Sequence, residues 1–136
     1  MNEIEKQIQE AKDRIAPLKA KYPRVFSKIE YVSCEEGWFP LIEALSDNIE
    51  RYIDRFVPNE LQDQVYFEDI KQKFGGLRVH MSHYIDYIQG AIAMTESVSY
   101  HVCEKCSERG QTYNVRSWIT TLCPKHHEEA LNRKSK

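Results

Sequence analysis

The stretch Cys103-Glu-Lys-Cys106 is followed, after sixteen further residues, by Cys123-Pro-Lys-His126, and this pattern decides how the end of the chain folds. Two ligand pairs with two residues inside each pair are typical of a structural zinc site. Each pair presents two ligands from one tight turn, and the loop between the pairs is long enough to bring them together. Three thiolates and one imidazole suit Zn(II), which has no geometric preference of its own. The pattern therefore predicts a structural zinc ion held by Cys103, Cys106, Cys123 and His126.

Two adjacent histidines leave the fourth ligand open. His126 repeats the two-residue spacing of the first pair, which favours it over His127. Pro124 fits the first turn of a helix, because its missing N–H is not needed there. The N-terminus of that helix would also stabilise the thiolate of Cys123.

The order of elements in the last third of the chain carries a resemblance. A turn with two cysteines comes first, then residues 112–122, which can form a hairpin containing Trp118, and finally a helix opened by Cys123. This order resembles a treble-clef zinc finger over residues 101–134. The resemblance implies a zinc-organised module with few large apolar residues of its own.

The sequence Leu-Cys-Pro-Lys-His-His at residues 122–127 also resembles the C-terminal half of a zinc-bearing HNH endonuclease motif. Such a nuclease needs a histidine that activates water near a catalytic metal. Between the two ligand pairs there is no His and no Asp, and Glu108 is the only carboxylate. The resemblance thus implies a shared scaffold without the catalytic half. A degenerate nuclease that uses His101 or His127 remains an alternative.

Two further segments carry a resemblance of the whole chain. They are Gly-Trp-Phe-Pro-Leu-Ile at residues 37–42 and Ile-Lys-Gln-Lys-Phe-Gly-Gly-Leu-Arg at residues 70–78. Both are similar to segments of small uncharacterised bacterial and bacteriophage proteins that end in a Cys-x2-Cys finger. This resemblance implies an accessory protein of a phage or mobile element, and no known activity.

Length and composition restrict the classes of protein to which this chain can belong. The 136 residues correspond to one domain, or to a small domain with a zinc appendage. The N-terminus is acidic without the apolar stretch of a signal peptide, and no apolar run approaches the roughly 20 residues of a membrane span. Three of the four cysteines belong to the metal pattern, which is typical of a reducing compartment. We expect a cytoplasmic protein that does not cross a membrane.

Charge is unevenly distributed. The formal net charge is −2, but residues 1–100 hold 12 Lys/Arg against 17 Asp/Glu, whereas residues 101–136 hold 7 against 4. Attraction of the whole protein to nucleic acid is therefore weak. The excess of basic residues in 101–136 is still compatible with a local basic surface on the metal module.

Apolar spacing predicts three helices before the metal module. Residues 2–21 carry a narrow heptad seam, which either pairs with a second copy in a homodimer or packs on the chain's own helices, with a kink or an end at Pro17. A core helix should begin near Trp38-Phe39-Pro40 and stop before Pro58. A third should run from about Tyr84 to Ser99.

A Gly-Gly pair between two alternating runs predicts a β-hairpin over residues 65–83. Folding about Gly75-Gly76 places Phe74 opposite Leu77 and Ile70 opposite Met81. One face is then apolar and includes Phe74. The other face is basic and carries Lys71, Lys73, Arg78 and His80. A helix over residues 60–74 is the competing interpretation.

These patterns together predict an α+β fold. It consists of a mostly helical body with a two-stranded hairpin over residues 1–100, and a treble-clef-like zinc module over residues 101–136 packed on it. Because no catalytic constellation is visible, we expect macromolecular binding without catalysis. The expected form is an inhibitor or adaptor that docks on a host protein or complex, such as a phage-encoded anti-defence protein.

The acidic body favours a protein partner. The basic hairpin face, Lys71, Lys73, Arg78 and His80, could contact either an acidic partner or phosphate. The alternative is a nucleic-acid-binding zinc finger protein, in which that face acts together with the basic residues of the module: Arg109, Arg116, Lys125, Arg133 and Lys134.

Overall fold

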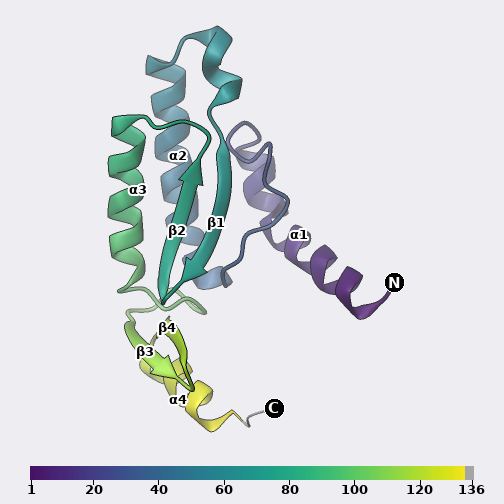
Figure 1. Ribbon diagram of the computed structural model, residues 1–136, viewed down its shortest axis with the longest axis vertical. Coiled ribbons are helices and arrows are strands. Elements are labelled where there is room, and N and C mark those ends of the chain that lie inside the picture. Colours follow the sequence, from purple (N-terminus) through teal and green to yellow (C-terminus); the bar gives the residue numbers. More distant parts are fainter. Residues whose placement is uncertain (134–136) are drawn as a thin grey trace.

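The computed structural model describes residues 1–133 and confirms the α+β class. Its centre is a β-hairpin of β1 (Phe67–Lys73) and β2 (Gly76–Met81), beside α2 (Phe39–Phe56) and α3 (Asp86–Ser99) (Figure 1). Helix α1 (Glu3–Lys21) lies on the other side of the hairpin, and the C-terminal module continues from one end of the body. Among the described residues, no helix combines the length and the apolar character that crossing a bilayer requires.

The two core helices were predicted from their apolar stripes. In α2 the stripe is buried through Ile42, Leu45, Ile49 and Ile53, and the helix ends before Pro58, as expected. Short 3-10 turns flank it at Glu36–Trp38 and Asn59–Gln64. The second of these replaces the competing prediction of a long helix over residues 60–74.

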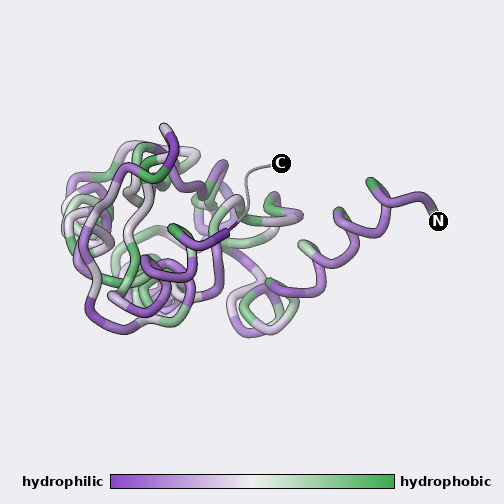
Figure 2. The backbone as a smooth tube through the Cα atoms, turned by 90° about the horizontal axis from the view of Figure 1, so that it is seen from below, coloured by the Kyte–Doolittle hydropathy of each residue, from purple (hydrophilic) through white to green (hydrophobic). Residues whose placement is uncertain are grey.

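Only the second half of α1 joins the core. Asn2 caps its start by accepting a hydrogen bond from the Glu5 N–H at 2.8 Å. Ile15 and Leu18 are buried, whereas Ile4 is 69% exposed and the first turns project from the body (Figure 2). Within the chain, only the second half of the heptad seam is therefore buried. Pairing of α1 with a second copy stays a prediction.

Of the two outcomes expected at Pro17, a kink or an end of the helix, the structure contradicts the end. The helix continues through Pro17 to Lys21. Pro17 removes one N–H, which deprives the carbonyl of Asp13 of its helical partner. Asp13 is exposed, so water can satisfy that carbonyl, and burial of Leu18 holds the last turn in place.

The predicted register of the central hairpin was wrong by two residues. The turn is Phe74-Gly75, with φ of 52° and 85°, and Lys73 pairs with Gly76 and Ile70 with Val79. Positive φ at both central positions is typical of a type I′ turn. Gly76 serves another purpose, because a Cβ there would overlap the ring of Tyr100.

A shift of two residues leaves Ile70, Leu77, Val79 and Met81 on one buried face, as predicted, because side chains alternate along a strand. A bulge between Phe67 and Asp69 turns both Phe67 and Ile70 into the core, although they are three residues apart. Phe74, predicted to be part of the apolar face, lies at the tip and is 66% exposed.

The C-terminal module consists of β3 (Gln111–Val115), β4 (Trp118–Leu122) and α4 (Pro124–Asn132). The strands are antiparallel, with Gln111 opposite Leu122 and Val115 opposite Trp118. They form a sheet separate from the central hairpin.

A short segment of the body anchors the module. The indole N–H of Trp38, which is fully buried, donates to the carbonyl of Val102 at 2.8 Å. The N–H of Gly37 donates to the carbonyl of Glu104 at 2.6 Å, and the Ser107 hydroxyl donates to the carbonyl of Gly37 at 2.7 Å. The backbones meet so closely that a Cβ at Gly37 would overlap Cys103 and Glu104.

This close approach predicts that Gly37→Ala destabilises the protein by at least about 2 kcal/mol, because backbone on both sides must move. Gly90→Ala is the matched control. Gly90 lies in α3 with nothing within 4 Å of its added Cβ, and alanine is the better helix former by about 1 kcal/mol. Urea unfolding of both variants measures the difference, and equal stabilities would contradict the close docking.

Candidate metal centre

Four potential ligands from two parts of the module, a tight turn and the start of α4, lie close together. Their donor atoms, from Cys103, Cys106, Cys123 and His126, all lie within 4.8 Å of one another. Nδ1 of His126 is 3.2 Å from the sulfur of Cys123 and 3.6 Å from that of Cys103, and the sulfurs of Cys106 and Cys123 are 3.7 Å apart. The predicted ligands are thus brought together.

The first two ligands are held by a tight turn. The N–H of Cys103 donates to the carbonyl of Glu108 at 2.7 Å, and the N–H of Ser107 donates to the carbonyl of Cys103 at 3.0 Å. Ser107 has a positive φ of 73°. Gly110 closes the turn, with its N–H bonded to the carbonyl of His101.

The other two ligands sit at the start of α4. Cys123 is its N-cap, and its sulfur accepts the His126 N–H at 3.5 Å. Burial alone would raise the pKa of the Cys123 thiol, but hydrogen bonds from the His126 backbone and ring and from the other two cysteines lower it to about 7. A thiolate, the form that binds metal, is therefore readily formed at this position.

The structure distinguishes the two histidines. His127 stacks on Tyr113, with ring centroids 3.5 Å apart and an interplanar angle of 3°. His126 instead turns Nδ1 toward the sulfurs, and its Nε2 lies 3.8 Å from the carboxylate of Glu129. Carboxylates commonly orient ligating imidazoles in this way.

These separations fit a tetrahedral ion. Bonds of about 2.3 Å to sulfur and 2.0–2.1 Å to nitrogen imply separations of roughly 3.8 Å between two sulfurs and 3.5 Å between sulfur and nitrogen at tetrahedral angles. The distances above agree with these values. The Cys3His group could therefore hold a metal ion, and its donors are consistent with zinc. It is the only such group among residues 1–133, so His80, His83 and His101 form no second centre there.

Most of the predicted binding residues have partners within the chain. Lys71 pairs with Asp69 at 3.2 Å, and His80 lies 3.7 Å from the same carboxylate. Arg78 donates to the Tyr100 hydroxyl at 2.6 Å. The hairpin face is thus partly neutralised by its own neighbours.

The basic residues of the module also differ in whether they have partners within the chain. Arg116 donates to the carbonyls of Ala130, Leu131 and Arg133 and so closes the C-terminal end of α4. Lys125 is exposed. Outside the module, Lys73 of the central hairpin lies over the ring of Phe74. Lys134 lies outside the described residues. The structure therefore gives Arg116 a structural role.

Sequence reasoning missed Glu104. This residue of the first metal turn is only 6% exposed, and its carboxylate accepts the Glu35 N–H at 3.1 Å and the Thr120 hydroxyl at 3.4 Å. Burial raises the pKa of this carboxyl. No sequence signal marks it, because its partners come from the body and from β4.

Cys34, the cysteine outside the metal pattern, is buried, and burial raises the pKa of its thiol to about 12. A thiol in that state is unreactive at neutral pH.

Comparison of the chain with protein-family models, with curated proteins and with solved structures gives no match in any of the three.

The geometry predicts about one metal ion per chain in the purified protein, lost in Cys106→Ser and Cys123→Ser and in His126→Ala. His127→Ala is the control, because that ring stacks on Tyr113 and should leave the metal in place. Elemental analysis measures the content. Loss of metal in the His127 variant, with retention in the His126 variant, would reverse the assignment.

Proposed function

We propose that this chain is a zinc-stabilised binding protein without catalytic activity, which docks on an acidic surface of a partner protein. The metal centre supports the first part. Its turn, hairpin and ligand-bearing helix follow the order of a treble-clef zinc finger, and three sulfurs with one imidazole are the donors of structural zinc sites.

The metal centre also favours binding over catalysis. Catalytic zinc keeps an open position for water or substrate, whereas four protein ligands close the site. His127, one of the two histidines that a degenerate nuclease could use to activate water, is stacked on Tyr113.

The observation that carries the docking proposal is a pair of exposed aromatic side chains. Phe74 at the tip of the central hairpin and Trp118 at the start of β4 are each 66% exposed. Both line one surface hollow of about 300 Å³, together with Lys73 and Ile119. Tryptophan and other aromatics that fill pockets dominate the energetics of protein interfaces. We call Lys73, Phe74, Trp118 and Ile119 the aromatic patch.

The aromatic patch is held by hydrogen bonds between the two hairpins. The Gln72 side chain donates to the carbonyl of Ile119 at 2.8 Å, and the Thr121 hydroxyl donates to the carbonyl of Gly75 at 2.7 Å. Because both aromatic residues stand on strands or tight turns, little ordering entropy is lost on binding.

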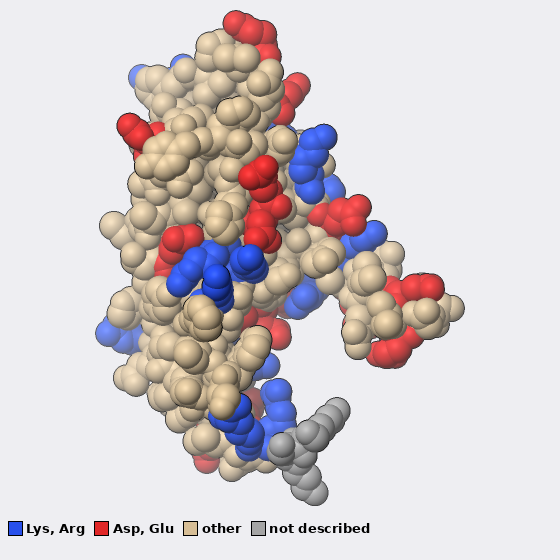
Figure 3. Space-filling view, in the orientation of Figure 1, with Lys and Arg blue, Asp and Glu red and all other residues tan. Residues whose placement is uncertain are grey.

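Charge at the aromatic patch favours an acidic partner. Lys73 is exposed beside Phe74, and no carboxylate of residues 1–133 lies within 4 Å of its ammonium. In the view of Figure 3, Lys and Arg side chains gather at mid-height of the molecule, with acidic groups above them. An inhibitor or adaptor for a host protein is the form that the resemblance to phage proteins suggests.

Nucleic-acid binding is the second candidate function. It is favoured by the exposed Lys125 and Arg109 and by the excess of basic residues in the module. Affinity that falls steeply with salt would support it, because phosphate contacts release counterions.

The docking proposal predicts that Phe74→Ala with Trp118→Ala abolishes capture of a protein partner from a bacterial lysate. Met94→Ala is the matched control, because Met94 is 67% exposed on α3 and lies outside the patch. Mass spectrometry of the eluates identifies the partner that the control retains and the double variant loses. Equal retention by both variants, or retention of nucleic acid alone, would contradict docking through the patch.

A further inference from the structure

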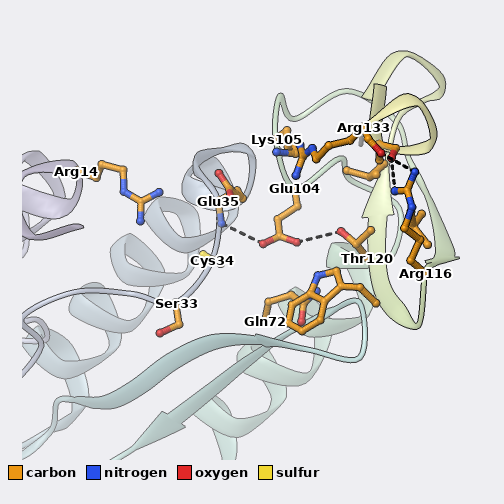
Figure 4. A pocket seen from close by; sticks show the side chains of 14 residues that line it. Arg14, Ser33, Cys34, Glu35, Gln72, Glu104, Lys105, Arg116, Thr120 and Arg133 are labelled. Carbon is orange, nitrogen blue, oxygen red and sulfur yellow. Dashed lines mark hydrogen bonds between the residues drawn. The ribbon is translucent and has the colours of Figure 1, made fainter. Parts of the chain in front are cut away.

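A second and larger cavity lies between the body and the metal module. Its volume is about 640 Å³, within the range of small-molecule sites. Arg14 enters it from α1, Glu35 from the anchoring segment, and Lys105 and Arg133 from the module (Figure 4). Figure 3 shows the surface hollowed between the projecting α1 and the module.

The charge of this cavity is opposite to that of the chain. Four cationic side chains, Arg14, Lys105, Arg116 and Arg133, line it against two carboxylates, Glu35 and Glu104, an excess of two positive charges in a chain of formal net charge −2. Concave sites lined by one sign of charge concentrate ligands of the other sign. The lining therefore favours an anion.

Three of these cations are available to a ligand. Within residues 1–133, Arg14, Lys105 and Arg133 have no carboxylate within 4 Å of their charged groups. Arg116 is different, since its guanidinium donates to three carbonyls at the end of α4. Guanidinium and ammonium groups that line one cavity from separate elements can each contact oxygens of a phosphorylated ligand, with Arg14 facing Lys105 and Arg133 across the cavity (Figure 4).

The remaining lining suits a planar ring. Trp118 contributes to the wall of this cavity as well as to the aromatic patch, and 66% of its surface is exposed. Stacking of a nucleobase on an aromatic side chain contributes about 1–3 kcal/mol. Glu104 lies in the lining, fixed by the Glu35 N–H and the Thr120 hydroxyl, and a carboxylate keeps further lone pairs for ring N–H donors.

We propose that this cavity binds a nucleotide, with Arg14, Lys105 and Arg133 on the phosphate and Trp118 stacked on the base. The ligand is either a free nucleotide or a nucleotide unit of a single strand, which present the same chemistry. None of the charged residues of this cavity belongs to the aromatic patch, but Trp118 is part of both surfaces.

The test titrates the full, metal-loaded chain with each of the four ribonucleoside 5′-monophosphates while tryptophan fluorescence is recorded. Trp38 is fully buried, so a change on binding reports Trp118. We expect at least one Kd below about 1 mM. Ribose 5-phosphate and the matching nucleoside, which each lack half of the ligand, should bind more weakly by about tenfold or more.

Two matched variants locate the site. Arg14→Gln with Lys105→Gln should weaken binding at least about tenfold, whereas Lys6→Gln, at an exposed lysine of α1 outside the cavity, should leave the affinity unchanged. Phe74→Ala should also leave it unchanged, which separates a failure of this site from a failure of protein docking. A Kd above about 1 mM for all four nucleotides, or equal affinities for the Arg14/Lys105 and Lys6 variants, would overturn the proposal.

A single-stranded oligonucleotide of about ten residues identifies the source of the nucleotide. If it binds more tightly and displaces the mononucleotide, the site takes a unit of a strand. If the mononucleotide binds and the strand does not displace it, the ligand is free. Either result supports the site only when the Arg14/Lys105 variant loses the binding.

Discussion

The buried hydrogen bond from the Trp38 indole to the carbonyl of Val102 is the contact on which the arrangement of this protein depends. An unpaired indole N–H in the core would cost the desolvation of that group, so the backbone that enters the metal turn must lie against α2. Gly37 reinforces the constraint, because its missing side chain lets Glu104 approach to hydrogen-bonding distance. The metal turn is therefore part of the body's surface and not a tethered appendage.

The two proposed binding surfaces depend on that docking. The two hairpins come from different parts of the chain, and hydrogen bonds between Gln72 and Ile119 and between Thr121 and Gly75 join them. The aromatic patch lies across this junction, and the cationic cavity lies between α1 and the module. Both surfaces need the module in its docked position, so a metal that organises the module would also organise them, although it touches neither.

The sequence allowed prediction of features set by local spacing and missed those set by tertiary partners. The ligand pairs and the stripe of α2 depend on residues close in sequence, so Cys103 and Ile49 could be assigned from pattern alone. The hairpin register could not, because the demand on Gly76 comes from Tyr100, more than twenty residues away. The partners of two predicted binding residues could not be foreseen for the same reason: Arg78 donates to the Tyr100 hydroxyl, and Arg116 donates to carbonyls at the end of α4. Glu104 was invisible, since it is a surface-type residue buried only by docking.

Hydrogen–deuterium exchange with and without bound metal tests the central claim most directly, that the metal centre and its docking on Gly37 and Trp38 form one structural unit. Removal of the metal by a chelator should abolish protection over β3, β4 and the metal turn, and also at the Gly37 amide and the Trp38 indole. The amides of α2, α3 and the central hairpin should stay protected. Retained protection of the module in the metal-free protein, or loss in the module with none at Gly37 and Trp38, would contradict the account.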